Sequence, residues 1–155
     1  VMIAMALILE PDLIIADEPT TALDVTIQAQ ILDVLRGLLR ESAGLLLITH
    51  DMGVVSQMAT YVAVMYAGQI VEQAAAAEFF SRPRHPYALA LLDAMPSAAN
   101  RGKRLKAIPG QVPAAGAFPS GCRFHDRCPV ARPDCARQPP DLAEVGGRLA
   151  RCPYV

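Results

Sequence analysis

The apolar positions in the first half of the chain predict an alternating α/β arrangement. One apolar run, 13–16, ends in the carboxylates Asp17 and Glu18, and a second run, 45–48, leads into His50. Short apolar runs bounded by polar turn residues are typical of buried strands in a parallel sheet. Between them, 26–41 places leucines and isoleucines at helical spacing. The pattern therefore predicts a βαβ unit with a right-handed connection.

The rest of the chain changes character along its length. Residues 1–9 are apolar and helix-forming but have no N-cap residue before them. A short helix at 52–58 and a hairpin formed by 61–66 and 69–73 are expected, followed by helices at 74–80 and 87–95. From Pro96 onward the periodicity disappears, and most of the prolines and all four cysteines lie in that part.

Composition limits the classes of function. With 155 residues the chain has room for one domain, or for a partial domain and an appendage. A net charge of −1 supplies no electrostatic argument for binding nucleic acid. Although 53% of residues are apolar, no run reaches the roughly 18 residues of a membrane span. At a membrane, the protein is therefore expected to act as a peripheral partner of other subunits.

Polar residues at the ends of the two predicted strands are the first candidates for chemistry. Ligands of open α/β sheets bind at the carboxyl ends of the strands. Of the adjacent carboxylates Asp17 and Glu18, one suits Mg²⁺ and the other suits orienting or deprotonating a water. His50 occupies the equivalent position after the second strand.

These segments resemble a known family. Residues 13–24 are similar to the Walker B segment and D-loop of ABC-type ATPases, and 47–51 resemble their switch-histidine segment. The resemblance implies ATP and Mg²⁺ as cofactors. It assigns Asp17 to Mg²⁺, Glu18 to the attacking water, His50 to the γ-phosphate and Asp24 to a contact with a second ATPase subunit.

Two motifs of that family are missing from the sequence. The resemblance places a Leu-Ser-Gly-Gly signature directly before the first helix, and a phosphate-binding Gly-x-x-x-x-Gly-Lys-Ser/Thr loop earlier still. Neither is present. We therefore expect an ATPase subunit truncated at its N-terminus, inactive by itself and at best weakly binding nucleotide.

The second half is similar to the C-terminal region of oligopeptide and dipeptide importer ATPases. The resemblance rests on 79–92, which contains His85-Pro86-Tyr87, on 108–113, and on the segments around Cys122 and Cys128. It implies a P-loop NTPase-type parallel sheet over 1–72 and a Cys/Pro-rich appendage with a short hairpin before it, the appendage covering 73–155. His85 and Tyr87 are interpreted as structural, since a polar turn into a helix explains them.

The same resemblance implies partners and a location. It predicts a second ATPase subunit in a homo- or heterodimer, two transmembrane permease subunits, and indirectly a periplasmic or lipoprotein substrate-binding protein, with no nucleic acid. It places the protein at the cytoplasmic face of the inner membrane as a peripheral subunit. Peptide is the leading substrate class, although nickel and glutathione importers share this architecture.

The cysteines Cys122, Cys128, Cys135 and Cys152 are separated by five, six and sixteen residues. An even number in a short proline-rich region suggests disulfides, which a reducing cytosol opposes. The spacing lacks the close pairs usual for structural zinc, and two Cys-Pro steps are typical of iron–sulfur ligands. Zinc and unligated thiols stay open as alternatives. The family resemblance implies a [4Fe–4S] cluster. His125 lies among the cysteines and could replace one ligand, although four thiolates already suffice.

Three functions compete on this reading. The first is the ATP-hydrolysing subunit of an ABC importer for peptides or related small solutes. The second is a non-hydrolysing docking or regulatory module that carries an iron–sulfur or zinc site. A soluble ABC-type ATPase of repair or translation is the third, and the His-Pro-Tyr and cysteine segments argue against it.

Overall fold

A computed structural model describes residues 5, 8–38, 43–95 and 107–155 of the chain. Its contacts divide into two compact units, Val1–Ala59 and Thr60–Val155, which are treated separately below. The helix expected over 1–9 lies largely outside the described residues, as does the end of the helix expected over 26–41.

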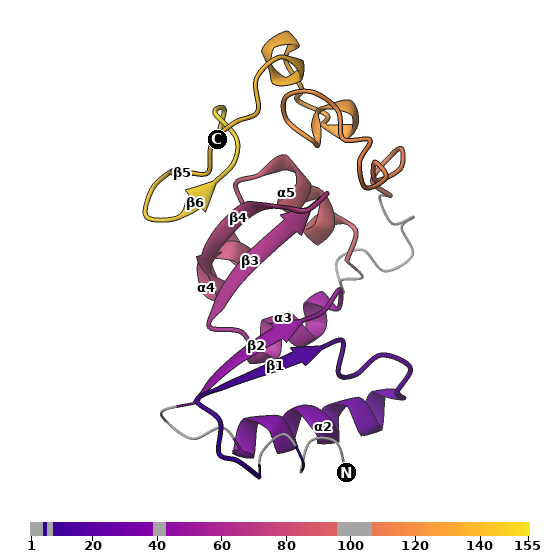
Figure 1. Cartoon of the computed structure of the whole chain (residues 1–155), viewed down its shortest axis with the longest axis vertical. Coiled ribbons are helices and arrows are strands. Elements are labelled where there is room, and N and C mark those ends of the chain that lie inside the picture. Colours follow the sequence, from indigo (N-terminus) through magenta and orange to yellow (C-terminus); the bar gives the residue numbers. More distant parts are fainter. Residues whose placement is uncertain (1–4, 6–7, 39–42, 96–106) are drawn as a thin grey trace. The chain divides into compact units, whose positions relative to one another are not determined.

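The first unit has the βαβ order that the apolar pattern predicts. It contains β1 (Leu13–Asp17), α2 (Val25–Leu38), β2 (Gly44–Ile48) and α3 (Met52–Met58). Strands β1 and β2 pair in parallel, in a register that runs from Leu13 opposite Gly44 to Asp17 opposite Ile48 (Figure 1). The peptide N–H of Glu18 donates to the Ile48 carbonyl at 2.8 Å and extends the pairing beyond β1. Both strand ends therefore meet at one edge.

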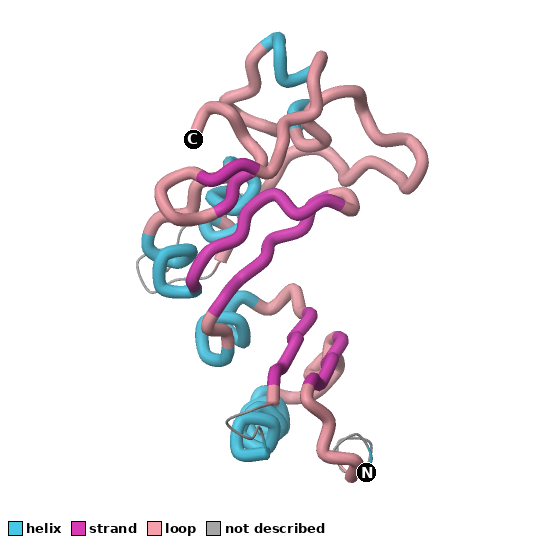
Figure 2. The backbone as a smooth tube through the Cα atoms, turned by 60° about the vertical axis from the view of Figure 1, so that its left-hand side comes forward, coloured by secondary structure: helices cyan, strands magenta, loops and turns pink. Residues whose placement is uncertain are grey.

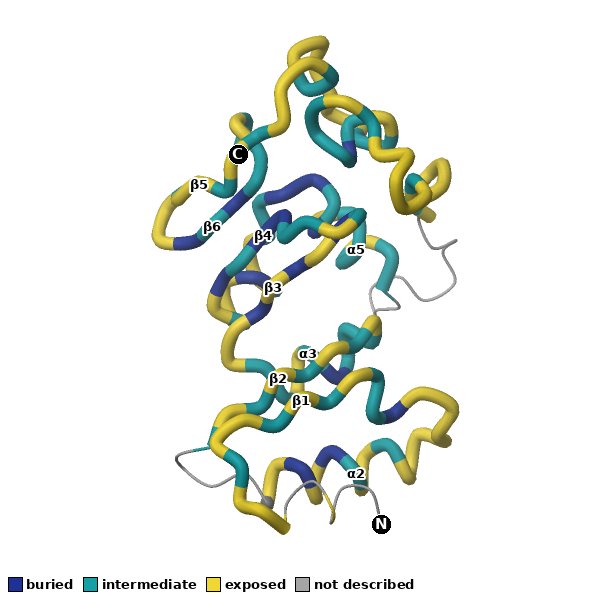
Figure 3. The backbone as a smooth tube through the Cα atoms, in the orientation of Figure 1, coloured by how far each residue is buried: buried dark blue, intermediate teal, exposed yellow. Residues whose placement is uncertain are grey.

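The two strands are less buried than their sequence suggests. Exposed and half-buried residues alternate along each of them (Figure 3). The exposed positions of the two strands lie opposite one another in the register and so share one face. This open apolar face consists of Leu13 (55% exposed), Ile15 (63%), Leu46 (49%) and Ile48 (45%). The burial expected on both faces is absent because no element among the described residues covers this one.

The second unit is built on a four-stranded antiparallel sheet in the order β3-β4-β6-β5. The hairpin expected from the sequence is confirmed as β3 (Tyr61–Tyr66) and β4 (Gln69–Ala75). Its turn residues Ala67 and Gly68 both have positive φ, 47° and 76°, as a tight type I′ hairpin requires.

Two short strands near the C-terminus complete that sheet, and the sequence pattern did not reveal them. They are β5 (Ala143–Glu144) and β6 (Leu149–Ala150). β6 pairs with β4, so Ala150 lies opposite Glu72 (Figure 2). The domain division expected between 72 and 73 falls inside β4, whereas the compact units divide between Ala59 and Thr60. The division between 72 and 73, which separates the ATPase part from the C-terminal transporter part of the family, stays a prediction.

Short helices and loops pack around this sheet. They include α4 (Ala76–Ser81), α5 (Pro86–Asp93) and the 3₁₀ turns η2 (His125–Arg127) and η3 (Pro133–Ala136). Phe124 is buried and forms an aromatic cluster with Tyr66 and Tyr87, with ring centroids 5.1 and 5.3 Å away. The chain is thus a small mixed α/β structure. Among its described helices, none is long and apolar enough to cross a bilayer.

Candidate functional site

Glu18 and His50 meet at the carboxyl edge of the β1–β2 pair. His50 Nδ1 lies 2.8 Å from Glu18 Oε1, and the hydroxyl of Thr21 donates to Glu18 Oε2 at 2.9 Å. Glu18 has a positive φ of 46°, which turns the chain sharply after the strand. The side chains stay open to solvent, 36% exposed for Glu18 and 82% for His50. The carboxylate is therefore held on both oxygens and remains accessible.

The pair is electrostatically coupled. The hydrogen bond from His50, followed by that from Thr21, lowers the pKa of Glu18 below its usual 4.5. The same hydrogen bond to Glu18 raises the pKa of His50 above 6.5. Near neutral pH Glu18 is thus an ionised acceptor beside an imidazole that is more easily protonated than usual. Such a pair can orient a water molecule and carry a positive charge beside it.

The wall of this site includes residues that sequence reasoning passed over. A cavity of about 210 Å³ is lined by Glu18, His50, Thr21, Gln28 and Asp51, among others. Gln28 Nε2 donates to Asp51 Oδ2 at 3.1 Å, which joins α2 to the start of α3. Asp51 Oδ1 accepts the Gly53 and Val54 N–H groups and caps α3. An Asp directly before a helix is a recognisable capping signal.

The structure places Asp17 and Asp24 outside this cavity. Successive strand side chains point to opposite faces, so Asp17 lies on the open apolar face beside Ile15 while Glu18 faces the cavity. Asp24 is exposed, and its Oδ1 accepts the Ile27 N–H at 2.9 Å, which caps α2. Sequence reasoning missed this capping role, although Asp before an apolar-periodic helix signals it.

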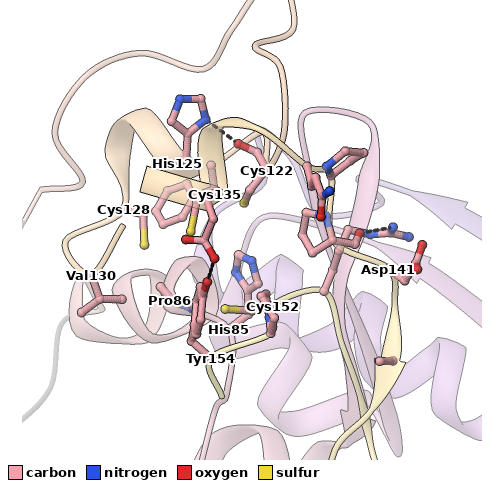
Figure 4. Close-up of a pocket in the computed structure, with 18 residues that line it drawn as sticks. His85, Pro86, Cys122, His125, Cys128, Val130, Cys135, Asp141, Cys152 and Tyr154 are labelled. Carbon is pink, nitrogen blue, oxygen red and sulfur yellow. Dashed lines mark hydrogen bonds between the residues drawn. The ribbon is translucent and has the colours of Figure 1, made fainter. Parts of the chain in front are cut away.

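The four cysteines gather around one cavity in the second unit. The cavity has a volume of about 430 Å³, and its wall includes Cys122, Cys128, Cys135 and Cys152 (Figure 4). All four thiols are free and half-buried. Residues that are up to 30 positions apart in the sequence are therefore brought together, as the prediction of one shared site requires.

Backbone contacts hold the cysteine-bearing segments in place. The Cys122 N–H donates to the Cys135 carbonyl at 2.7 Å, and Gly121 allows this approach because a Cβ there would overlap the same oxygen. Cys128 closes η2 through the His125 carbonyl at 3.2 Å. Cys152 directly follows Arg151 in the sequence, and the peptide N–H of Arg151 donates to the Val71 carbonyl of β4 at 2.8 Å. The sheet therefore positions the fourth cysteine.

Burial raises the pKa of Cys122, Cys128 and Cys152, and the neighbouring thiols raise it further. Without a metal these three thiols are thus protonated near neutral pH, and any metal must displace their protons. Within the described residues, no three His, Cys, Asp or Glu side chains are grouped closely enough for a single metal ion. The thiols share a cavity wall but are spread more widely than the ligands of one ion.

The two histidines of the cavity wall are held differently. His125 Nδ1 contacts the Cys122 carbonyl at 2.7 Å and its Nε2 contacts Asp126 at 2.9 Å. In Figure 4 its ring points away from the cysteine sulfurs. Both ring nitrogens are occupied, so the structure does not present His125 as a substitute ligand. His85 is only 1% exposed and lies among the cysteine side chains of the wall.

Comparison with known proteins finds a family match in the second unit and relatives over nearly the whole chain. Residues 71–135 match the family described as oligopeptide/dipeptide transporter, C-terminal region. The chain is 53% identical, over 92% of its length, to a putative peptide import ATP-binding protein of Brucella ovis, and 48% identical, over 99%, to one of Brucella abortus. It is also 48% identical, over 98% of its length, to the dipeptide transport ATP-binding protein DppD of Haemophilus influenzae.

These matches agree with the predicted family: residues 71–135 match its C-terminal region, and proteins named as peptide import or dipeptide transport ATP-binding proteins are similar to the chain over at least 92% of its length. It spans less than half of the length of these relatives, 44% of the B. ovis protein and 46% of the other two. In family terms it corresponds to their C-terminal region.

Proposed function

We propose that the chain is the C-terminal part of an ABC-type ATPase subunit that drives import of dipeptides or oligopeptides. The observation that carries this proposal is the Glu18–His50 contact of 2.8 Å at the carboxyl edge of two parallel strands. Relatives named as peptide and dipeptide import ATP-binding proteins support it. Nickel and glutathione are the competing substrate classes, because their importers share this architecture.

Glu18 and His50 have complementary roles in this proposal. Glu18 Oε1 and Oε2 are oriented by His50 and Thr21, so the ionised carboxylate is fixed where it can accept a hydrogen bond from an attacking water. The exposed outer edge of the His50 ring is available to the γ-phosphate of ATP. Positioning of the nucleophile and stabilisation of charge are the main contributions that a protein makes to phosphoryl transfer.

Asp17 is the proposed Mg²⁺ ligand, because a carboxylate oxygen is the kind of ligand that Mg²⁺ binds. Its carboxylate is exposed and lies at the end of the open apolar face. Mg²⁺ there would neutralise phosphate charge. We further propose that the nucleotide-gripping part of the subunit packs on this face, whose leucines and isoleucines would otherwise stay in water. Asp24 caps α2 through Oδ1, and we propose that its second carboxylate oxygen contacts a partner ATPase subunit.

The cysteine cavity is proposed to hold a [4Fe–4S] cluster. Four thiolates are the ligand set that such a cluster needs, and all four cysteines line one cavity. Zinc is the alternative occupant of the same four thiols. The bound cluster would crosslink the segments around Cys122, Cys128, Cys135 and Cys152.

The partners and location follow from the proposed role. A second ATPase subunit and two transmembrane permeases would complete the importer, with a substrate-binding protein acting through the permeases. The subunit would then be peripheral, at the cytoplasmic face of the inner membrane. A non-hydrolysing docking or regulatory module with the same metal site is the alternative, and it differs in lacking any requirement for Glu18.

Turnover of a complete subunit tests the ATPase proposal. Glu18→Gln keeps the shape of the side chain and removes the charge, so we expect ATPase activity to fall on the order of 10²–10⁴-fold with ATP binding retained. The matched control is Asp33→Asn, which removes an exposed carboxylate on α2 and should leave turnover unchanged. Equal, wild-type-like activity of the Glu18 variant and the control would remove Glu18 from the mechanism, and absence of turnover in the wild-type complete subunit would support the non-hydrolysing module.

Metal analysis tests the cluster proposal on the chain itself. After anaerobic reconstitution with iron and sulfide we expect a brown protein with about four irons per chain. Serine at Cys128 or Cys135 should abolish the colour. One zinc and no iron after purification would replace the cluster by a zinc site, and no metal would leave unligated thiols.

A further inference from the structure

The wall of the cavity that the four cysteines line also includes a buried histidine with an unused bonding position. His85, the histidine of the His-Pro-Tyr segment, is 1% exposed and belongs to the same cavity wall (Figure 4). A buried histidine is most often a satisfied core residue. Here only one of its two ring nitrogens has a hydrogen bond within the described structure.

The position of the imidazole is set from three sides. Its peptide N–H donates to Glu72 Oε2 of β4 at 2.7 Å, and Glu72 also accepts the Arg84 N–H at 3.0 Å. Its ring Nδ1 accepts the Tyr87 N–H at 3.1 Å, which caps α5. The ring of Phe124 packs 5.9 Å away, centroid to centroid. The imidazole is therefore rigidly placed before anything enters the cavity.

These contacts determine the tautomer. A peptide N–H can only donate, so Nδ1 must carry the lone pair and the ring proton must reside on Nε2. Burial lowers the pKa of His85 to about 4, so the ring is neutral near pH 7. Among the described side chains, the buried polar atoms without a partner belong to Arg84 and Arg148. His85 Nε2 is not one of them, and His85 belongs to the wall of the cavity.

We propose that His85 Nε2–H donates a hydrogen bond to a sulfur of the iron–sulfur group held by the four cysteines, and thereby raises its reduction potential. This inference rests on the proposed [4Fe–4S] cluster. His85 is a positioning and tuning residue and not a ligand. Reduction adds one negative charge to the cluster, and a donor aimed at a sulfur stabilises that charge.

The variant that isolates the donor is His85→Asn. Asparagine is a good N-cap and can still accept the Tyr87 N–H, but its short side chain has no donor at the position of Nε2. His125→Asn is the matched control, since His125 lines the same cavity with both of its nitrogens bonded elsewhere. Both variants and the wild-type chain are reconstituted anaerobically with iron and sulfide and titrated with dithionite.

We expect reduction of the His85→Asn protein to be about tenfold less favourable, which is 59 mV for a one-electron couple. The control should change less than threefold. Independently, ¹⁵N NMR of the wild-type chain should show the Nε2–H tautomer of His85, a measurement that does not depend on whether the variant folds.

Each failure has its own signature. An Nδ1–H tautomer overturns the inference, and so does an iron-loaded His85→Asn protein with an unchanged potential or with the same shift as the control. Wild-type chain that binds no iron and sulfide overturns the cluster proposal, and the donor role with it. That outcome is read from the metal content of the wild type before any variant is compared.

Discussion

Substitution of Gly121 by alanine should disrupt the wall of the cysteine cavity, because the added methyl group would collide with backbone atoms of that wall. Gly121 has a φ of +73°, and a Cβ at this position would overlap the Cys135 carbonyl oxygen and lie 2.7 Å from the Ala136 carbonyl carbon. Both contacts are with backbone, which cannot rotate away as a side chain can. The oxygen concerned also accepts the Cys122 N–H at 2.7 Å. The methyl group must therefore separate Cys122 from Cys135.

The size of the effect can be built from its parts. A left-handed backbone costs a non-glycine residue roughly 1–2 kcal/mol. Losing the Cys122–Cys135 hydrogen bond adds about 0.5–1.5 kcal/mol, and displacement of the packed segments adds to both. We therefore expect Gly121→Ala to lower the free energy of unfolding of the second unit by about 2–4 kcal/mol. That is a large share of the stability of a small domain.

Gly116→Ala is the matched control because it separates the two causes. Gly116 also has a positive φ, 87°, but nothing lies within 4 Å of the position that a Cβ would take there. Its substitution should therefore cost only the backbone part. Urea unfolding followed by tyrosine fluorescence measures both, since all four tyrosines belong to the second unit and the chain has no tryptophan. Equal destabilisation by the two variants would refute the close approach of Gly121 to Cys135.

Three further predictions concern buried or paired ionisable groups. Glu72→Ala should destabilise the second unit by about 2–4 kcal/mol in urea unfolding, because it leaves the N–H groups of Arg84 and His85 buried without an acceptor; a loss below about 1 kcal/mol would contradict this. The NMR titration midpoint of His50 should lie above 6.5 and return toward it in Glu18→Gln. The stabilisation from protonated His50 is complete below pH 6.5 and is lost as the pH rises through the raised pKa of His50. The stabilisation from ionised Glu18 is present above pH 4.5 and is lost as the pH falls through the lowered pKa of Glu18. Because the pKa of His85 falls to about 4 on folding, the unfolded chain binds more protons between pH 4 and 6.5, and acidification through that range should remove up to about 3 kcal/mol of stability; His85→Asn should lack this dependence.

Local patterns in the sequence were sufficient for the order of the elements from β1 to α5 and for the choice of Glu18, His50 and the four cysteines as candidate residues. Apolar runs ending in Glu18 and His50 predict strands whose ends meet, and the structure brings the two side chains to 2.8 Å. The Ala67-Gly68 step predicts the hairpin turn. These features depend on residues close together in the chain, where periodicity and turn chemistry carry the information.

Other features depend on the tertiary structure alone. The two-residue strands β5 and β6 have no period that a pattern could reveal, and β6 exists because it pairs with β4 more than 70 positions earlier. The donor edge of His85 is fixed by Tyr87 and by Glu72 of that same strand. Spacing placed four thiols in one region but could not say which way they face. The direction in which they face is decided by non-local backbone pairing, because this pairing sets which surfaces of distant segments meet. It leaves His85 beside the cysteines and His125 turned away from them.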